Sequence, residues 1–352
     1  MIINGMTFPV DYTYSPANTY QAFLLQSYNN IRANLVAMIR QIYLVTRINP
    51  ALFPCYKNLL DTFDRNCTIL YRIILLSGRR NSSAYYYLEK FLDANIGILQ
   101  TLYSLPQDSD SITVKKLYRL MAKEKWTCYD LNRMFHMPFQ LKKKVKDYRY
   151  SQMGRPCLYL GSSLDICLKE MNSTKKNDFY ASEFWLSDNK NLRVINFSYT
   201  LQEVIDFCLS NDKDKISFFE AWWFFYPFMY ACSVVQRSPT KDEYKLPQML
   251  VQYVVDSSKL DGIRYISTKV NGGYVWTKKI MNFAIPVKAD KLSGFDDDLI
   301  EKFRLSVPLN LSKVKTLQIA ENKLERYKKR KIGKFYFRNI WYWLAKNVLR
   351  MK

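Results

Sequence analysis

The chain has 352 residues, 48% of them hydrophobic, which is enough for one large or two ordinary folded domains. Its 53 Lys and Arg residues against 31 Asp and Glu give a net charge of +22. Ten glycines argue against Gly-rich linkers and a Rossmann phosphate loop, and one histidine with seven scattered cysteines argues against a structural zinc site. The charge implies an anionic counterpart (nucleic acid, a membrane surface, a phosphorylated metabolite or an acidic protein), unless it is only a general bias toward lysine.

The first part of the chain has the patterns of helices alone. Three segments show them, residues 31–42, 51–76 and 88–103. Residues 111–124 are expected to form one further helix. The sequence therefore predicts an all-helical N-terminal domain over residues 1–126, in which no catalytic cluster is recognisable.

The pattern changes near Thr127. Short apolar runs typical of strands follow, at residues 157–160, 192–199, 262–268, 272–277 and 282–287. Helical segments lie between them, at residues 162–171, 201–210, 214–235 and 246–254. This mixture predicts an α+β domain over residues 127–290.

Two apolar segments raise the question of membranes. Residues 221–235 fall short of the roughly 20 residues that span a bilayer and contain Pro227, so we expect a buried helix there. Residues 291–352 are expected to form a basic helical tail. Its apolar stripe can dock on the protein itself, lie on an anionic membrane or touch nucleic acid, and the sequence leaves these open.

Four polar residues at the ends of apolar strands are the candidates for chemistry: Arg149, Tyr159, Glu170 and Ser267. Such positions are where binding sites tend to be built. A guanidinium suits a pyrophosphate, a tyrosine offers a flat face, and a lone carboxylate can stabilise an oxocarbenium ion. The sole histidine, His136, is more often a structural residue than a base. From these residues alone, an enzyme and a binding protein both remain open.

The run "YRYSQMGRPCLYLGSSLDICLKE" over residues 148–170 resembles the signature of RES-domain proteins, which are named for their Arg, Glu and Ser. Tyr159 and Glu170 stand eleven residues apart, as they do in that family. "YKLPQMLVQYV" (244–254) resembles its Pro-Gln-x-Leu helix. "DGIRYIST" (261–268) resembles the strand that delivers the serine, and "MFHMPF" (134–139) resembles the opening strand of a subgroup with larger chains.

The resemblance implies a fold related to ADP-ribosyltransferases, with NAD as the substrate and no metal. It implies that Arg149 holds the pyrophosphate and that Tyr159 stacks near the nicotinamide ring or the ribose. Glu170 would stabilise the oxocarbenium-like transition state, and Ser267 would orient the ribose or the acceptor. The residues expected to bind the cofactor are His136, Arg149, Tyr159 and Ser162; many members carry an arginine where this sequence has His136.

The leading hypothesis is an NAD-degrading enzyme that splits the nicotinamide–ribose bond and passes ADP-ribose to phosphate or water. It would act as a bacterial toxin or an anti-phage effector, in the cytoplasm because a secretion signal is not recognisable, with an acidic antitoxin and self-association as further expectations. One alternative uses the same site to ADP-ribosylate a protein or nucleic acid. The other is a non-enzymatic basic protein that binds nucleic acid or membranes.

Overall fold

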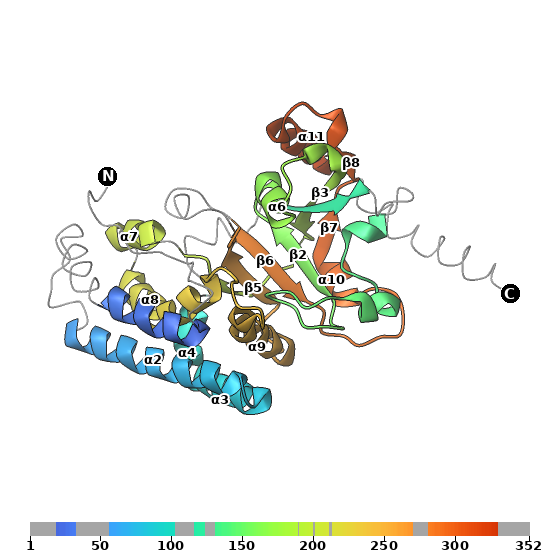
Figure 1. The fold of residues 1–352 in the computed structure, drawn as a ribbon. Coiled ribbons are helices and arrows are strands. Elements are labelled where there is room, and N and C mark those ends of the chain that lie inside the picture. Colours follow the sequence, from blue (N-terminus) through green and yellow to red (C-terminus); the bar gives the residue numbers. More distant parts are fainter. Residues whose placement is uncertain are drawn as a thin grey trace.

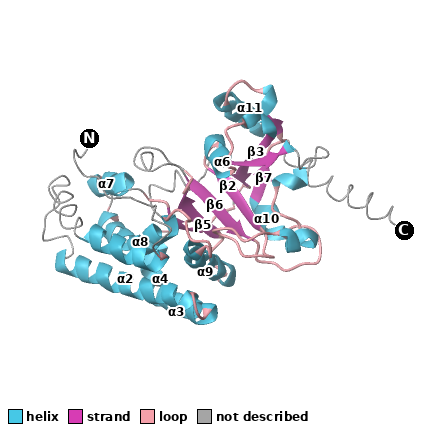
Figure 2. Cartoon of the chain, viewed as in Figure 1, coloured by secondary structure: helices cyan, strands magenta, loops and turns pink. Residues whose placement is uncertain are grey.

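The structure is a computed structural model that describes residues 19–32, 56–102, 116–123, 131–188, 190–199, 201–210, 213–269 and 281–329. Within these residues, helices and strands are both abundant (Figure 2). The strands form one mixed sheet, and a group of helices lies beside it (Figure 1). The α+β class predicted from the sequence is therefore confirmed.

Among the described strands, the sheet is antiparallel except at one pair. Its order is β4 (Val194–Phe197), β5 (Gly262–Ile266), β6 (Met281–Pro286), β2 (Cys157–Gly161), β1 (Leu117–Ala122), β3 (Phe179–Leu186) and β7 (Phe303–Leu305), and β8 (Leu309–Asn310) also pairs with β3. β4 and β5 run parallel. The connection between them contains helices, which is what a parallel pair requires.

The sheet divides between β2 and β1. Within the described residues these strands share one registered pair, Tyr118 opposite Gly161, whereas β1 pairs with β3 along its whole length. The chain thus has one half-sheet made of β4, β5, β6 and β2, and a second made of β1, β3, β7 and β8.

The helices fall into two groups. The larger group holds residues 20–32 and α2 (Tyr56–Ser77), α3 (Asn81–Ala94), α4 (Ile96–Thr101), α7 (Leu201–Leu209), α8 (Lys215–Ser233) and α9 (Asp242–Asp256). Shorter pieces accompany the strands: η3 (Leu131–Met134), η4 (Phe139–Lys144), α6 (Leu164–Glu170), η5 (Lys176–Asp178), α10 (Asp297–Lys302), η7 (Leu311–Lys313) and α11 (Leu317–Lys329).

Helix α8 is the centre of the helical group. Its side chains are apolar on almost every side, and a helix of that kind has to be buried. The Tyr28 hydroxyl donates to the Pro227 carbonyl of α8, and the Trp223 indole donates to the Leu59 carbonyl of α2. The same apolar core reaches Ile263 of the sheet. Each large side chain removed from water there contributes roughly 1.5–3 kcal/mol.

Most predicted elements of the second half are confirmed. Strands lie within or over the segments 157–160, 192–199, 262–268 and 282–287, and helices at 162–171, 201–210, 214–235 and 246–254. The prediction for residues 272–277 falls outside the described residues. Among the described residues, none of the helices combines the length and apolar character that crossing a bilayer needs.

The prediction of a helix over residues 111–124 is wrong for Leu117–Ala122, which is strand β1. Both of its faces are buried: Leu117 belongs to one apolar core and Tyr118 and Leu120 to another. A strand covered on both faces lacks clear alternation, so its apolar pattern resembles that of a helix. The division at residue 126 thus assigned a sheet strand to the helical domain.

Two further predictions need correction. The tail after residue 291 is not all helical, because β7 and β8 lie in it and pair with β3. The opening strand is β1 rather than residues 134–139, where 3₁₀ helices η3 and η4 flank an extended Pro138. In both cases the strands form through pairing with segments far away in the chain. The local sequence pattern carries no information about such partners.

Candidate functional site

Glu170 is the last residue of α6, the helix that follows strand β2. The Ser163 hydroxyl caps this helix by accepting from the Ile166 backbone N–H at 3.2 Å. With α6 anchored at its first residue and buried along one face, the position of Glu170 at its end is fixed.

The Glu170 carboxylate accepts two hydrogen bonds from the neighbouring strands. The Ser267 hydroxyl, directly after β5, donates to Glu170 Oε1 at 2.5 Å. The Asn282 amide, in β6, donates to the same oxygen at 2.6 Å. Ser267 is 2% and Asn282 4% exposed, so both donors are fixed within the fold. The structure thus brings together Glu170 and Ser267, and adds Asn282, which was not predicted.

The register of the sheet explains this meeting. Gly161 lies opposite Asn282, and Asn282 lies opposite Tyr265 on its other side. Residues directly opposite one another project from the same face of a sheet, and so does Tyr159, two residues before Gly161. Tyr159, Asn282 and Tyr265 therefore share one face.

Tyr159 brings a buried hydroxyl to that face. The hydroxyl lies beside the Ser151 side chain and the Tyr150 backbone, and the Tyr148 ring packs edge-on with 6.4 Å between ring centres. Burial, and after it the nearby Cys157 thiol, raises the pKa of Tyr159 well above its usual range. The group is therefore a neutral phenol.

Arg149 lies in a turn that the helical group holds. Its Nη1 donates to the Cys232 carbonyl of α8 at 3.1 Å, and its guanidinium lies 5.0 Å from the centre of the Tyr244 ring of α9. Gln248 of α9 fixes the turn by donating to Asp147 Oδ1 at 2.6 Å. The segment resembling a Pro-Gln-x-Leu helix thus has a structural task, which is to hold the arginine turn.

Tyr265 links the arginine turn to the carboxylate. Its ring stacks on Tyr150, the neighbour of Arg149, with 4.1 Å between centres. Its pKa is raised by burial first and then by the negative charge of Glu170, while the positive charge of Arg149 opposes the rise. Both charges are therefore close enough to act on one phenol. The site joins a cation, a carboxylate and stacked aromatic rings.

The other two predicted cofactor ligands are placed differently. His136 is 1% exposed; its Nδ1 donates to the Met137 carbonyl at 2.8 Å, and its Nε2 accepts from the Asp296 N–H at 3.0 Å. Burial lowers the pKa of His136 to about 4, so the ring is neutral. The Ser162 hydroxyl accepts from the Met281 N–H at 3.2 Å, joining β2 to β6. Their ligand roles stay predictions.

Sequence reasoning passed over Arg119 of β1. Burial lowers the pKa of its guanidinium to about 10, and Nη1 has no hydrogen-bond partner among the described residues. Its neighbour Tyr118 lies opposite Gly161, so Arg119 projects from the other face of β1, and its charge helps to lower the pKa of His136. In the run "LYRLMA" a single arginine lies between apolar residues. Had the run been predicted as a buried strand, this charged residue would have been recognised as unusual.

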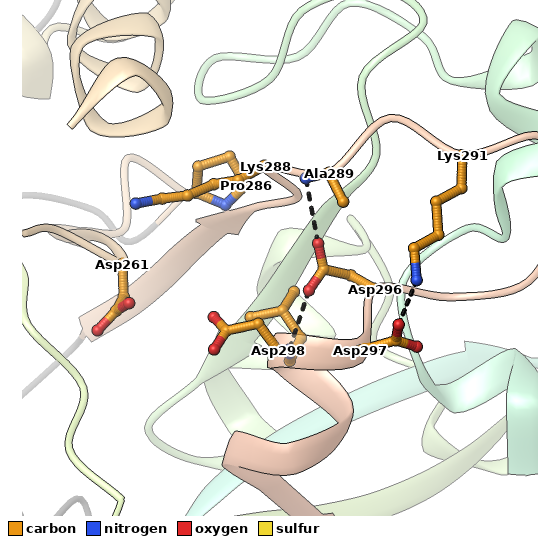
Figure 3. A pocket seen from close by; sticks show the side chains of 9 residues that line it. Asp261, Pro286, Lys288, Ala289, Lys291, Asp296, Asp297 and Asp298 are labelled. Atoms are coloured by element: carbon orange, nitrogen blue, oxygen red, sulfur yellow. Dashed lines mark hydrogen bonds and ion pairs between the residues drawn. The ribbon is translucent and has the colours of Figure 1, made fainter. Parts of the chain in front are cut away.

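A pocket of about 330 Å³ lies at the opposite end of β5 and β6 (Figure 3). Asp261, just before β5, and Lys288, just after β6, line it together with residues 296–299. Glu170 meets these strands at their other ends. The pocket is therefore separate from the candidate site.

The cysteines are reduced thiols in the described part of the chain: Cys67, Cys157, Cys167, Cys208 and Cys232. Burial raises the pKa of the Cys157 and Cys167 thiols to about 12, so neither is a thiolate at neutral pH. In the same part of the chain, His, Cys, Asp and Glu side chains form no group of three that would hold a metal ion.

Comparison with known proteins assigns this arrangement to a family. The RES domain matches residues 116–293, about half of the chain. The chain belongs to the RES-domain family. The match begins one residue before β1, in agreement with the place of that strand in the sheet.

A curated relative from Bacillus subtilis (strain 168), named "Putative toxin YopC", is 32% identical over 210 residues. The alignment covers 57% of this chain and 47% of the relative, so the chain spans about half the length of that protein. Significant matches to solved structures were not found. This RES-domain protein is thus similar to a protein named as a toxin.

Proposed function

We propose that this RES-domain protein consumes NAD by cleaving the nicotinamide–ribose bond and transferring ADP-ribose to phosphate or water. The observation that carries the proposal is the Glu170 carboxylate held by Ser267 and Asn282. The family is associated with NAD, and the similarity to a protein named as a toxin favours NAD depletion as the outcome.

The chemistry asks for a fixed negative charge beside ribose C1′. The bond between nicotinamide N1 and C1′ breaks, and its electron pair leaves with nicotinamide, which becomes neutral. Positive charge then develops on C1′ and the ring oxygen, and a carboxylate stabilises it. An oxygen of phosphate or water forms the new bond to C1′, and water releases one proton.

The cation and the rings near Glu170 suit the rest of a dinucleotide. Arg149 supplies a guanidinium group, which binds phosphate oxygens through paired hydrogen bonds. Arg149 would exchange its contact with the Cys232 carbonyl for the pyrophosphate. The Tyr159 ring, which shares a sheet face with Asn282, would stack near the nicotinamide ring or the ribose.

The direct test is incubation of the purified full chain with NAD, with and without phosphate, followed by chromatography of the products. We expect free nicotinamide in both cases, ADP-ribose in water and a phosphorylated ADP-ribose when phosphate is present. NAD that stays intact at micromolar protein would reject the proposal. Labelled NAD that ends on protein or nucleic acid would instead support the alternative acceptor.

Two variants of helix α6 complete the test. Glu170→Gln keeps the size of the side chain and removes its charge, so we expect a fall of roughly 10²–10³-fold in turnover. Asp165→Asn is the matched control, since Asp165 is an exposed carboxylate that pairs with Lys169 on the same helix. We expect it to retain wild-type turnover.

A further inference from the structure

The two oxygens of Glu170 have different surroundings. Oε1 accepts from Ser267 at 2.5 Å and from Asn282 at 2.6 Å. Oε2 accepts no hydrogen bond from the residues that the structure describes. One oxygen is thus held by the protein, and the other is left for a ligand.

The direction of both hydrogen bonds is fixed by chemistry. An ionised carboxylate only accepts, so Asn282 turns its NH₂ group toward Glu170. Ser267 donates to Glu170 and also accepts from the Lys269 N–H at 3.3 Å. Because both donors sit at the ends of adjacent strands, they cannot follow Glu170 if it rotates.

Gly161 gives the Asn282 side chain its room. A Cβ at residue 161 would lie 2.7 Å from Cys167 Sγ and 3.3 Å from Asn282 Oδ1. Any larger residue opposite Asn282 would push on its amide or on helix α6. The end of β2, the amide and the carboxylate thus form one packed unit.

We propose that Asn282 is a positioning residue that, with Ser267, clamps Glu170 Oε1 so that Oε2 faces the reacting ribose carbon. The inference rests on the proposed function for Glu170. If one of the two donors is lost, the Glu170 carboxylate can rotate about the terminal torsions of its side chain. The reacting oxygen would then be correctly placed for a smaller fraction of the time, which lowers turnover more than binding.

Kinetics of Asn282→Ala and Asn282→Asp test the clamp. For Asn282→Ala we expect kcat for NAD loss to fall at least tenfold while KM changes less than threefold. Asn282→Asp keeps the shape of the amide but opposes one carboxylate to another, so at pH 8 it should be less active than Asn282→Ala. At pH 5.5 the two carboxylates share a proton, which the introduced carboxyl can donate to Glu170, and the activity relative to Asn282→Ala should rise.

The buried Asn196 of β4 supplies a matched control. Its Oδ1 accepts from the Ser198 N–H and hydroxyl, a contact confined to its own strand end. Asn196→Ala should lower thermal stability and leave kcat and its pH profile unchanged.

Two kinetic results would overturn the clamp: a kcat of Asn282→Ala within twofold of wild type, or an Asn282→Asp to Asn282→Ala ratio that does not change with pH. A crystal structure of Asn282→Ala separates this failure from failure of the proposed function. Glu170 turned away from Ser267 supports the clamp even if NAD is not the substrate. Glu170 unchanged in place overturns it, whatever the substrate.

Discussion

The two ends of strands β5 and β6 both carry carboxylates, but they satisfy them differently. At the end shown in Figure 3, Asp261 pairs with Lys302 at 2.6 Å, and Asp296 accepts from the backbone N–H groups of Leu299 and Ala289. At the other end Glu170 is held by two uncharged donors through one oxygen. At the first end the carboxylates bind a lysine or backbone N–H groups of the protein itself. At the second end, only Oε1 of Glu170 accepts hydrogen bonds from the described residues.

The difference shows that the partners of a carboxylate, rather than its residue type, distinguish the candidate site. Asp261, Asp296 and Asp298 would attract attention in any count of acidic residues. Each has a cation or a helix terminus as its partner. Variants at the two ends should therefore separate stability from activity.

After Glu170 itself, the largest effect is expected at Arg149. Arg149→Ala removes the guanidinium proposed to bind pyrophosphate, and we expect kcat/KM for NAD to fall about 100-fold, mainly through KM. Lys291→Ala at the other end removes a cation of the pocket and should leave both constants unchanged. Steady-state NAD consumption measures this, and an unchanged KM for Arg149→Ala would contradict the role.

Asp296→Ala tests the opposite end. The variant loses the cap of α10 and the acceptor for Ala289 N–H, so we expect the free energy of unfolding to fall by about 2–3 kcal/mol. Turnover per folded molecule should match wild type, because Glu170 is untouched. Urea unfolding and NAD consumption measure the two quantities. A specific loss of turnover would show that the ends are coupled.

His136 makes the free energy of unfolding depend on pH. Its pKa in the folded protein is about 4, below the value near 6.5 of an exposed histidine, because it is buried. A lowered folded pKa means that stability is complete above pH 6.5 and is lost as the pH falls toward 4. Between pH 7.5 and 5 we expect a loss of about 2 kcal/mol. In His136→Gln the unfolding free energy should lose this part of its pH dependence; an unchanged slope would contradict the assignment.

The smallest effect is expected for the exposed pair of Lys291 and Asp297, drawn in Figure 3. Asp297 is 75% exposed, so water screens the attraction. Lys291→Ala should change the free energy of unfolding by less than about 0.5 kcal/mol. A larger change in urea unfolding would mean that this loop supports the Asp296 cap.

Local patterns predicted much of this fold and part of the site. The strand "CLYL", the helix that ends at Glu170 and the strand before Ser267 could all be recognised from short stretches of sequence. The family resemblance named Glu170 and Ser267 as site residues, and only the structure shows the hydrogen bond between them. Strand β3 was not predicted, and Asn282 was passed over inside an apolar strand.

The sequence by itself determined the α+β class and the elements whose pattern is local: amphipathic or wholly apolar helices, and strands ended by polar residues. Only the tertiary structure decided that β1 is a strand, that β7 and β8 return to the sheet, and that Asn282 faces Glu170. The reason is physical. A helix satisfies its backbone within itself, whereas a strand and its register exist only through partners that are distant in the chain.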